Sequence, residues 1–522
     1  MSLETMLAGL ITGAHNGRPS VLLTDGYKFS MAQAGFPLRR ETFVLSFRRR
    51  GSWVVPCDLA EVVQAMLPDV DSLNIKQRGF LDAFGYGLTP AMEQALRGSV
   101  EVDYLPTGTV FGPREPILTI TGPSFLVSWL EPLVIMLNHC IQVTTAILRG
   151  QIEGTMDARC EDEAAIIDLC WKMASHIKQL QHPVWSSVAK RPSVTAAVLA
   201  PSGRVVGPRH KFYNLLGILG GLEPESRIFE VGMRGACCAQ HHLGVLAKLK
   251  RSGLRSTSNV LGAWRHNLYP VGTTGHEHQQ RWNKDLLAFM AIRDMRPETP
   301  SYLFDTYDVE SGMTCIATAM REEPDRQVSI RLDSGDQEVQ LRYMVKDYND
   351  AYSLERDPVY IFEDGYDDLS TEKMEALRRE LGIDDDHAWY GYGSHLVEDH
   401  VSWTRNAVSA AYKLSCTGER PTMKVSGSKG KESLPGRPVV FRRLQKSGTP
   451  AGYKIDLIGQ VGEPVPEGYE VLSVVHGYSP VHSYEFVDPL SEPFFIDPGS
   501  DSPAIDLSSG TRKQVGRIAM DQ

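Results

Sequence analysis

Four short apolar runs between residues 301 and 396 each end in acids, glycines or hydroxyls, and segments with helical patterning separate them. The runs are SYLFDTYD (301–308), VSIRLDSGD (328–336), VYIFEDGYDD (359–368) and AWYGYGSHL (388–396). Apolar runs that alternate with helices are typical of a parallel sheet. The carboxyl ends of such strands meet at one edge, where α/β proteins build their sites. The repeat therefore predicts an α/β fold with a site at these strand ends.

The flanking segments extend this pattern on both sides. Three of them repeat the order of strand, loop and helix: residues 226–254, 255–267 and 269–290. Residues 100–123 are rich in β-branched side chains and predict two strands joined by a turn. Within the repeat, Ser370 can cap a helix over 370–381, and Gly382 ends it.

A long apolar stretch covers residues 124–152, and polar positions interrupt it from Glu131 onward. It predicts a buried helix rather than a membrane span, because no run approaches 18 apolar residues. The N-terminus has no basic region before an apolar core, so we expect a cytoplasmic protein without membrane contacts.

The composition is that of a soluble globular protein of two or three domains. Among 522 residues, 42% are hydrophobic and 23% are charged, and the net charge is −10. A general role on nucleic acid or on acidic membranes needs a basic face, which this balance disfavours. Eight cysteines are scattered without a C-x-x-C motif, so buried thiols are expected rather than a zinc knuckle or a redox pair.

Pairs of acids follow the first three strands of the repeat. They are Asp305 and Asp308, Asp333 and Asp336, and Asp364 and Asp367. A carboxylate can accept hydrogen bonds from both vicinal hydroxyls of a ribose. It also stabilises a cationic ribosyl transition state. Any single acid could equally be a solvated loop residue, but their shared rim favours a site.

Glycine, hydroxyl and imidazole groups complete the candidate chemistry. Gly393 and Ser394 follow the fourth strand, where backbone N–H groups can hold a phosphate, although a plain turn would look the same. His276, in VGTTGHEH, can act as base, ligand or phosphate acceptor, or can be a hydrogen-bonded loop histidine. His278 lies on a different helical face, which disfavours a two-histidine metal site.

Positive charges and one aromatic residue lie near the same segments. Arg234, Arg331 and the cluster 48–50 suit carboxylates and phosphates. Arg331 precedes Asp333 by two positions on one strand, so both point to the same side and an internal ion pair is the alternative. Tyr27 can stack on a flat ring, or pack in the core.

Taken together, these motifs resemble the nicotinate phosphoribosyltransferase family. The matching blocks, in the family's order, are LTDGYKFSMAQAGF, GTVFGPREPILTITGP, STSNVLG, PVGTTGHEH, FDTYDVESG, IRLDSGD, YGYGSHL, AAYKL and KVSGSKGKESLPG. The resemblance implies an irregular α/β barrel of the type II phosphoribosyltransferase kind, with a mixed α/β domain formed from both termini. We assign residues 1–150 to the first part of the mixed domain, 151–226 to a largely helical and irregular insertion, 227–425 to the barrel and 426–522 to the segment that completes the mixed domain.

The resemblance also implies the reaction. Nicotinate and phosphoribosyl pyrophosphate would give nicotinate mononucleotide and pyrophosphate, with Mg²⁺ and ATP, in a homodimer whose sites lie at the subunit interface. The implied roles are the following: His276 is phosphorylated by ATP with Asp305 as its hydrogen-bonding support; Tyr27 packs on the pyridine ring across the dimer; Thr273, Arg234 and Arg331 surround the base; Asp333, Asp364 and Gly365 approach the ribose; Gly393 and Ser394 approach the 5′-phosphate.

The choice of base depends on fewer positions. Ser258 stands where the nicotinamide-using relatives place an acid, which favours nicotinate because an acid would repel its carboxylate. Val231 and Gly235 depart from the family's aromatic residue and second arginine, and the family lacks most of residues 153–226. Nicotinamide, another heteroaromatic base and a catalytically idle ligand-binding homologue therefore stay open as alternatives.

Overall fold

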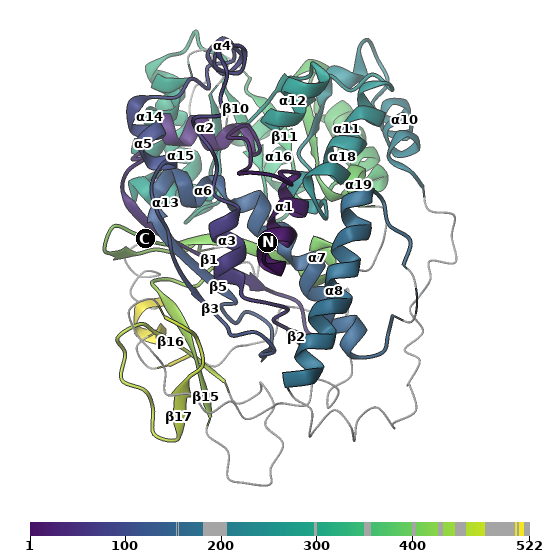
Figure 1. Cartoon of the computed structure of the whole chain (residues 1–522). Helices are drawn as coiled ribbons and strands as arrows, with labels where there is room; N and C mark the ends of the chain where they lie inside the picture. Colours follow the sequence, from purple (N-terminus) through teal and green to yellow (C-terminus); the bar gives the residue numbers. More distant parts are fainter. Residues whose placement is uncertain are drawn as a thin grey trace.

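The computed structural model describes residues 1–152, 154, 156–180, 206–296, 300–348, 357–398, 403–425, 432–443, 456–475, 507–508 and 511–515 (Figure 1). Much of the predicted insertion and most of the tail beyond residue 443 lie outside these residues. So does the stretch 426–431 of the basic, glycine- and serine-rich loop.

Seven parallel strands form the central sheet. They are β6 (Ile228–Glu230), β7 (Ser256–Thr257), β8 (Tyr269–Pro270), β9 (Ser301–Leu303), β10 (Ser329–Leu332), β11 (Val359–Phe362) and β12 (Ala388–Tyr392). Their order is β8-β7-β6-β12-β11-β10-β9, so the last strand pairs with the first and the edges are β8 and β9. Strands consecutive in sequence are thus neighbours around a barrel that is open at one seam. The four strands predicted in the repeat are confirmed as β9 to β12.

Side chains bridge the seam between β8 and β9. Thr274 Oγ1 donates to the Ser301 carbonyl at 3.2 Å, and Gln279 Nε2 donates to the Leu303 carbonyl at 2.5 Å. These bonds satisfy β9 carbonyls that would accept from a neighbouring strand if the sheet closed here. The predicted irregular α/β barrel is therefore confirmed.

Helices follow the barrel strands and surround the sheet (Figure 1). They are α11 (Ala239–Lys250), α12 (Val260–His266), α13 (His276–Trp282), α14 (Asp285–Met295), α15 (Val309–Glu322), α16 (Gln337–Tyr343), α18 (Asp368–Leu381), α19 (Ser394–Val397) and α20 (Arg405–Val408). In α15 the buried residues Met313, Ile316, Ala317 and Met320 recur at spacings of three and four, so one apolar stripe packs inward.

The helix predicted over 370–381 begins two residues earlier than expected. Asp367, not Ser370, is its N-cap: the Ser370 N–H donates to Asp367 Oδ1 at 2.9 Å, and the Asp367 N–H donates to Ser370 Oγ at 2.8 Å. This reciprocal pair satisfies two backbone donors at the helix start. Gly382 ends the helix in the left-handed region with φ 73°, as predicted.

A second sheet combines the two ends of the described chain. Its order is β14-β13-β1-β5-β3, with β1 (Arg40–Phe47), β3 (Glu101–Tyr104), β5 (Leu118–Pro123), β13 (Ala410–Thr417) and β14 (Arg420–Pro421). After the barrel, the chain thus returns to pair antiparallel with β1, placing Lys413 opposite Val44. The sheet draws two strands from the range 227–425, and the four domain ranges stay a prediction.

Helices α6 (Ser124–Trp129) and α7 (Glu131–Leu148) form the apolar stretch that was predicted to be a buried helix. By length and composition α7 could cross a membrane, but every residue of its 18-residue window is buried inside the protein. Helix α8 (Glu161–Leu180), from the insertion, packs along it. The prediction of a buried helix is confirmed.

The other elements of the N-terminal half are α1 (Leu3–Thr12), α2 (Gly26–Gln33), β2 (Trp53–Val54), α3 (Leu59–Ala65), α4 (Ile75–Ala83), α5 (Pro90–Leu96), β4 (Val110–Phe111) and α10 (Pro208–Leu219). A small antiparallel sheet of β15 (Pro438–Arg443), β16 (Leu457–Gln460) and β17 (Tyr469–Val471) lies at the lower end of the molecule (Figure 1). Arg437 anchors it to β3 through a two-pronged ion pair with Asp103 at 2.5 and 2.7 Å.

Candidate active site

A cavity of about 520 Å³ opens at the carboxyl ends of the barrel strands, against the second sheet. Nine of the predicted site residues line it: Tyr27, Arg234, His276, Arg331, Asp333, Asp364, Gly365, Gly393 and Ser394. A second cavity of about 540 Å³ lies inside the barrel, and it is lined by Thr273 and Ser258 together with Tyr27, Arg234 and Arg331. Because five residues border both cavities, the two spaces adjoin; they are Tyr27, Val231, Arg234, Arg331 and Glu363.

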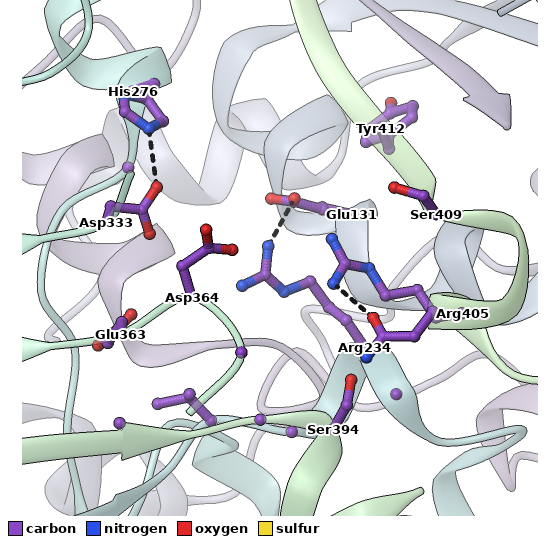
Figure 2. A pocket seen from close by; sticks show the side chains of 18 of the residues that line it. Glu131, Arg234, His276, Asp333, Glu363, Asp364, Ser394, Arg405, Ser409 and Tyr412 are labelled. Atoms are coloured by element: carbon purple, nitrogen blue, oxygen red, sulfur yellow. Dashed lines mark hydrogen bonds and ion pairs between the residues drawn. The ribbon is translucent and has the colours of Figure 1, made fainter. Parts of the chain in front are cut away.

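His276, the first residue of α13, lies between an anion and a cation (Figure 2). Its Nε2 is 3.1 Å from Asp333 Oδ2 and 2.8 Å from Lys424 Nζ, and its Nδ1 is 2.9 Å from Thr306 Oγ1. Burial lowers the pKa of His276, and the Lys424 charge lowers it further against the opposing effect of Asp305. A neutral imidazole with one acceptor nitrogen is therefore favoured at neutral pH, and this form can act as a nucleophile.

Asp305 lies behind the histidine rather than against it. Its Oδ1 is 3.9 Å from His276 Nε2, whereas its Oδ2 accepts from Lys424 Nζ at 3.0 Å and from the Ser334 hydroxyl. Burial would raise the pKa of this carboxyl, but its interactions with His276, Lys424 and the Ser334 hydroxyl hold it below its usual value. Asp305 thus reaches the ring through Lys424.

Arg331 is ion-paired on both sides, as the alternative interpretation of the Arg-x-Asp spacing anticipated. It binds Asp333, and its Nε lies 3.0 Å from Glu363 Oε2. Its guanidinium also donates to Thr273 Oγ1 at 3.2 Å and to the Thr274 carbonyl at 2.8 Å. The strand register therefore fixes the Asp333 carboxylate toward His276, with a pKa held well below its usual range by Arg331 and His276 despite burial.

Tyr27 and Arg234 meet at a buried carboxylate on α7. Glu131 accepts from the Tyr27 hydroxyl at 3.2 Å, from Arg234 at 3.3 Å and from Lys28. Burial would raise the pKa of Glu131, but Lys28, Lys413 and Arg234 lower it strongly, so this acid stays ionised. Tyr27 comes from the same chain as His276. The predicted packing of Tyr27 across a dimer stays a prediction.

The loop after β11 presents Asp364 to the middle of the cavity (Figure 2). Asp364 and Gly365 both have positive φ, at 79° and 83°, and Gly365 has open space around it. Left-handed backbone at consecutive positions makes a sharp turn that favours glycine at the second one. The turn brings the Asp364 side chain inward and leaves the Gly365 backbone accessible to a ligand.

Positive side chains collect at the far end of the cavity from His276. Arg48, Arg405, Lys211 and Lys413 line this end, next to Gly393 and Ser394. Figure 2 shows Arg405 beside Arg234 and above Ser394. The Ser394 hydroxyl donates to Glu398 at 3.1 Å. Burial raises the pKa of Glu398, which reduces its repulsion of an anion at this end.

Ser258 is itself neutral, but it lies against a buried acid. Its hydroxyl donates to Asp25 Oδ1 at 2.6 Å, and both residues line the barrel cavity. Burial raises the pKa of Asp25, although Arg234 and the Ser258 hydrogen bond oppose this. A carboxyl group thus lies one hydrogen bond behind the position where nicotinamide-using relatives place theirs.

The known proteins that are similar to this chain are nicotinate phosphoribosyltransferases. Residues 226–429 match the model of the nicotinate phosphoribosyltransferase (NAPRTase) family. Nicotinate phosphoribosyltransferase 2 of Arabidopsis thaliana is 25% identical over 512 residues, which cover 90% of this chain and 82% of the relative. Nicotinate phosphoribosyltransferase of Homo sapiens is 23% identical over 499 residues, covering 87% and 82%.

This chain is similar to the nicotinate phosphoribosyltransferase family. The crystal structure of nicotinate phosphoribosyltransferase from Porphyromonas gingivalis has the same fold, with a TM-score of 0.51 at 19% identity. The match covers 79% of this chain and 95% of the chain in the crystal structure. The resemblance seen in the motifs, the type II phosphoribosyltransferase fold and the class of enzyme, a phosphoribosyltransferase, are confirmed.

Several residues of the site were not singled out from the sequence. They are Asp25, Glu131, Glu363, Arg405, Lys413 and Lys424. Lys424 opens the KVSGSKGKESLPG block, so the block indicated its neighbourhood but not its bond to His276. Lys413 lies in AAYKL, another matching block. Glu131 interrupts an apolar stretch as Glu-Pro, and such an isolated buried acid is the signal that could have identified it.

Proposed function

We propose that this chain transfers the 5-phosphoribosyl group of phosphoribosyl pyrophosphate to nicotinate, giving nicotinate mononucleotide and pyrophosphate. The observation that supports this most is the convergence of His276, Asp333, Asp364 and Arg234 on one cavity. Such a cavity offers carboxylates for a sugar, cations for anionic groups and an imidazole that can accept a phosphoryl group. The names of the relatives support the same reaction.

In this proposal, the ribose lies between Asp333 and Asp364. The two carboxylates accept from its hydroxyls and stabilise the positive charge that develops when the bond to pyrophosphate breaks. Asp333 is held in place by Arg331, so its charge is oriented before the substrate arrives. The electron pair of the breaking bond leaves with pyrophosphate, and the ring nitrogen of the base forms the new bond to the ribosyl carbon.

The 5′-phosphate is assigned to the basic end of the cavity. Gly393 offers backbone groups there, and Arg405 and Lys413 offer positive charge. The distance along the cavity from this end to His276 separates the phosphate from the group that accepts phosphoryl from ATP. This separation lets one substrate contact both ends.

The base is assigned to the wall where the two cavities adjoin. Tyr27 offers an aromatic face, and Arg234 and Arg331 offer guanidinium groups that suit a ring carboxylate. Val231 lines the same wall, so at that position the ring meets an aliphatic side chain. A pyridine carboxylate uses each of these contacts, whereas an amide offers the two arginines no further anionic group.

ATP coupling is assigned to His276. A lowered pKa keeps the ring neutral, and Lys424, in contact with Nε2, offers positive charge to an incoming phosphoryl group. Transfer breaks the bond between the γ-phosphorus and the bridging oxygen, which leaves with ADP, and forms a phosphorus–nitrogen bond on the ring. A phosphorylated His276 beside Asp333 changes the charge at this end of the cavity and so couples ATP to binding of the sugar pyrophosphate.

Mg²⁺ fits the carboxylates next to the histidine. Asp305 Oδ1 is buried and has no hydrogen-bond partner among the described residues, and it lies near Asp333. Oxygen ligands from one or two carboxylates, completed by substrate phosphates, suit this ion. We propose that Asp305 and Asp333 would hold it, where it neutralises charge on pyrophosphate.

A homodimer is also proposed, on the family resemblance alone, and light scattering of the purified chain tests it. The cytoplasmic location expected from the sequence also stays a proposal. Neither proposal affects the assignment of the residues that line the cavity from a single chain.

The function is tested by product analysis. Purified chain is given phosphoribosyl pyrophosphate, ATP, Mg²⁺ and equal amounts of nicotinate and nicotinamide, and both mononucleotides are quantified by mass spectrometry. We expect nicotinate mononucleotide as the main product, with pyrophosphate in equal amount. Nicotinamide is the second candidate acceptor, because Asp25 behind Ser258 could accept from an amide.

Each outcome of the competition has a meaning. A predominance of nicotinamide mononucleotide would replace the substrate but keep the reaction. No product with either base, while a panel of other ring acids reacts, would point to a different heteroaromatic acceptor. Binding of phosphoribosyl pyrophosphate without turnover on any base would contradict the proposal and favour an idle ligand-binding homologue.

A further inference from the structure

Cys160 and the adjacent pair Cys237 and Cys238 meet beside the site. Cys160 Sγ is 3.5 Å from Cys238 Sγ, and Cys238 Sγ is 3.9 Å from Cys237 Sγ, with all three sulfurs within 4.8 Å of one another. Cys160 and Cys238 are 78 positions apart, which is why no spacing motif announced the cluster. Cys237 and Cys238 are buried, and Cys160 is partly exposed, so the cluster has one open side.

Two helix N-termini point at these sulfurs. Cys160 directly precedes α8, and its carbonyl accepts from the Ala164 N–H at 3.1 Å. Cys238 is the N-cap of α11, and its Sγ accepts from the His241 N–H at 3.5 Å. The positive ends of helix dipoles stabilise thiolates.

The spacing of the sulfurs fits a metal ion. Four-coordinate zinc has Zn–S bonds of about 2.3 Å, which places tetrahedral thiolates roughly 3.8 Å apart. The Cys160–Cys238 and Cys238–Cys237 sulfur separations of 3.5 and 3.9 Å bracket this value. A buried imidazole stands next to the group: His241 Nδ1 is 3.6 Å from Cys237 Sγ.

We propose that Cys160, Cys237 and Cys238 bind one thiophilic divalent cation of the zinc type, with water in the fourth position. Binding releases the thiol protons to solvent as the sulfurs become thiolate ligands. Glu163, which also lies near Cys237, is committed to Arg159 at 2.6 Å and is left out of the ligand set. Three soft ligands exclude Mg²⁺, so this site is independent of the catalytic carboxylates.

Occupancy would tie the insertion to the active site. Cys160 directly precedes the insertion helix α8, while Cys237 follows the short helical turn Met233–Gly235 that carries Arg234. A cation that joins these segments fixes the backbone three residues from a guanidinium of the substrate cavity. The site is thus placed to stabilise the position of Arg234.

Cobalt reports on this proposal directly. The reduced full-length chain is titrated with Co²⁺, and then with Zn²⁺ in competition, while absorbance and metal content are followed. We expect one equivalent of Co²⁺ with a thiolate charge-transfer band and tetrahedral visible bands, and displacement by Zn²⁺. In Cys160→Ser the affinity should fall at least about tenfold. The variants Cys315→Ser and Cys416→Ser remove isolated thiols and should bind as the parent does.

A second readout needs no variant. Zn²⁺ should protect Cys160 from alkylation in the parent protein, measured by mass spectrometry of its peptide. Binding with an oxygen-ligand cobalt spectrum, or equal affinity in Cys160→Ser, would overturn the proposal. The proposal would also be overturned if the purified protein contained a Cys160–Cys238 disulfide and still bound no metal once that disulfide was reduced. Unchanged alkylation of Cys160 in the presence of Zn²⁺ would overturn it as well.

Discussion

Two rings of carboxylates surround the same end of the barrel, and they do different work. The outer ring, Asp308, Asp336 and Asp367, caps the helices α15, α16 and α18. The inner ring, Asp305, Asp333 and Asp364, turns toward His276 and the cavity. Each outer acid follows an inner acid by three residues. Acids of one type, three positions apart, thus divide between structure and chemistry.

The environments of the two rings explain this division. An outer acid such as Asp308 accepts from a backbone N–H of its own helix, here that of Ser311 at 2.7 Å. Such a bond needs no burial and no partner charge. Asp305 and Asp333 instead share Lys424, and Asp333 also pairs with Arg331. Both carboxylates are held ionised against burial. The inner ring therefore carries oriented charge, and the outer ring completes helices.

The largest expected difference between the rings is catalytic. Asp333→Asn removes the charge that faces the sugar, and kcat/KM for mononucleotide formation should fall about 10³-fold. Asp336→Asn keeps a good helix cap and should stay within about twofold of the parent. Initial rates of pyrophosphate release measure both variants. Similar losses in the two would erase the distinction between the rings.

A smaller effect is expected at the base. Arg234→Gln removes a charge that we assign to the ring carboxylate, while Glu131 keeps Lys28 as its partner. A hydrogen bond to a charged group contributes about 1.5 to 3 kcal/mol, so KM for nicotinate should rise roughly 10- to 100-fold. The matched change Arg97→Gln breaks an exposed ion pair with Asp71 and should leave KM unaltered. An unchanged KM in Arg234→Gln would move the base elsewhere.

The basic end of the cavity predicts a pH dependence. Burial lowers the pKa of Lys413 to about 8, although Glu131 opposes this shift. As the pH rises through this value the side chain loses its charge, so KM for phosphoribosyl pyrophosphate should increase above pH 8. Lys413→Arg stays charged and should flatten this part of the profile. If the parent and the arginine variant rise together above pH 8, Lys413 does not hold the phosphate.

The smallest effect concerns stability and belongs to the outer ring. Asp308→Ala should lower the free energy of unfolding by about 1 kcal/mol, measured in urea, with kcat unchanged.

The outer ring also predicts a pH dependence of stability at Asp367. Burial raises and the Ser370 hydrogen bonds lower the pKa of Asp367, with a net decrease. A carboxyl with a lowered pKa adds stability above about pH 4 that is lost as the pH falls through the lowered value. Asp367→Ala should therefore lose less stability in acid than at pH 7.

Much of the fold followed from local sequence. The repeat over 301–396 predicted four barrel strands, because apolar runs and helix signals alternate within short distances. The shared rim of Asp333, Asp364 and His276 followed from parallel-strand geometry. The cap at Asp367 was assigned to Ser370 because the sequence shows which polar residues lie near a helix start, not which one leaves the helical conformation.

The site residues that the sequence did not predict depend on contacts between distant parts of the chain. Lys424 reaches His276 across 148 positions, and Asp25 reaches Ser258 across 233. The three-cysteine cluster likewise joins α8 to α11. No periodicity or motif spacing encodes such pairs, since the packing of separate elements creates them. These long-range contacts of the site therefore follow only from the three-dimensional packing.

The most direct test of the central claim is labelling by ATP. The parent chain, Asp336→Asn and His276→Asn are incubated with ATP labelled at the γ-phosphate, and the peptide that contains residue 276 is analysed by mass spectrometry at alkaline pH. The account predicts one labelled phosphate on His276 in the parent and in Asp336→Asn, none in His276→Asn, and faster mononucleotide formation wherever the label appears. Absence of label from the parent, or label on another residue with His276→Asn fully active, would contradict it.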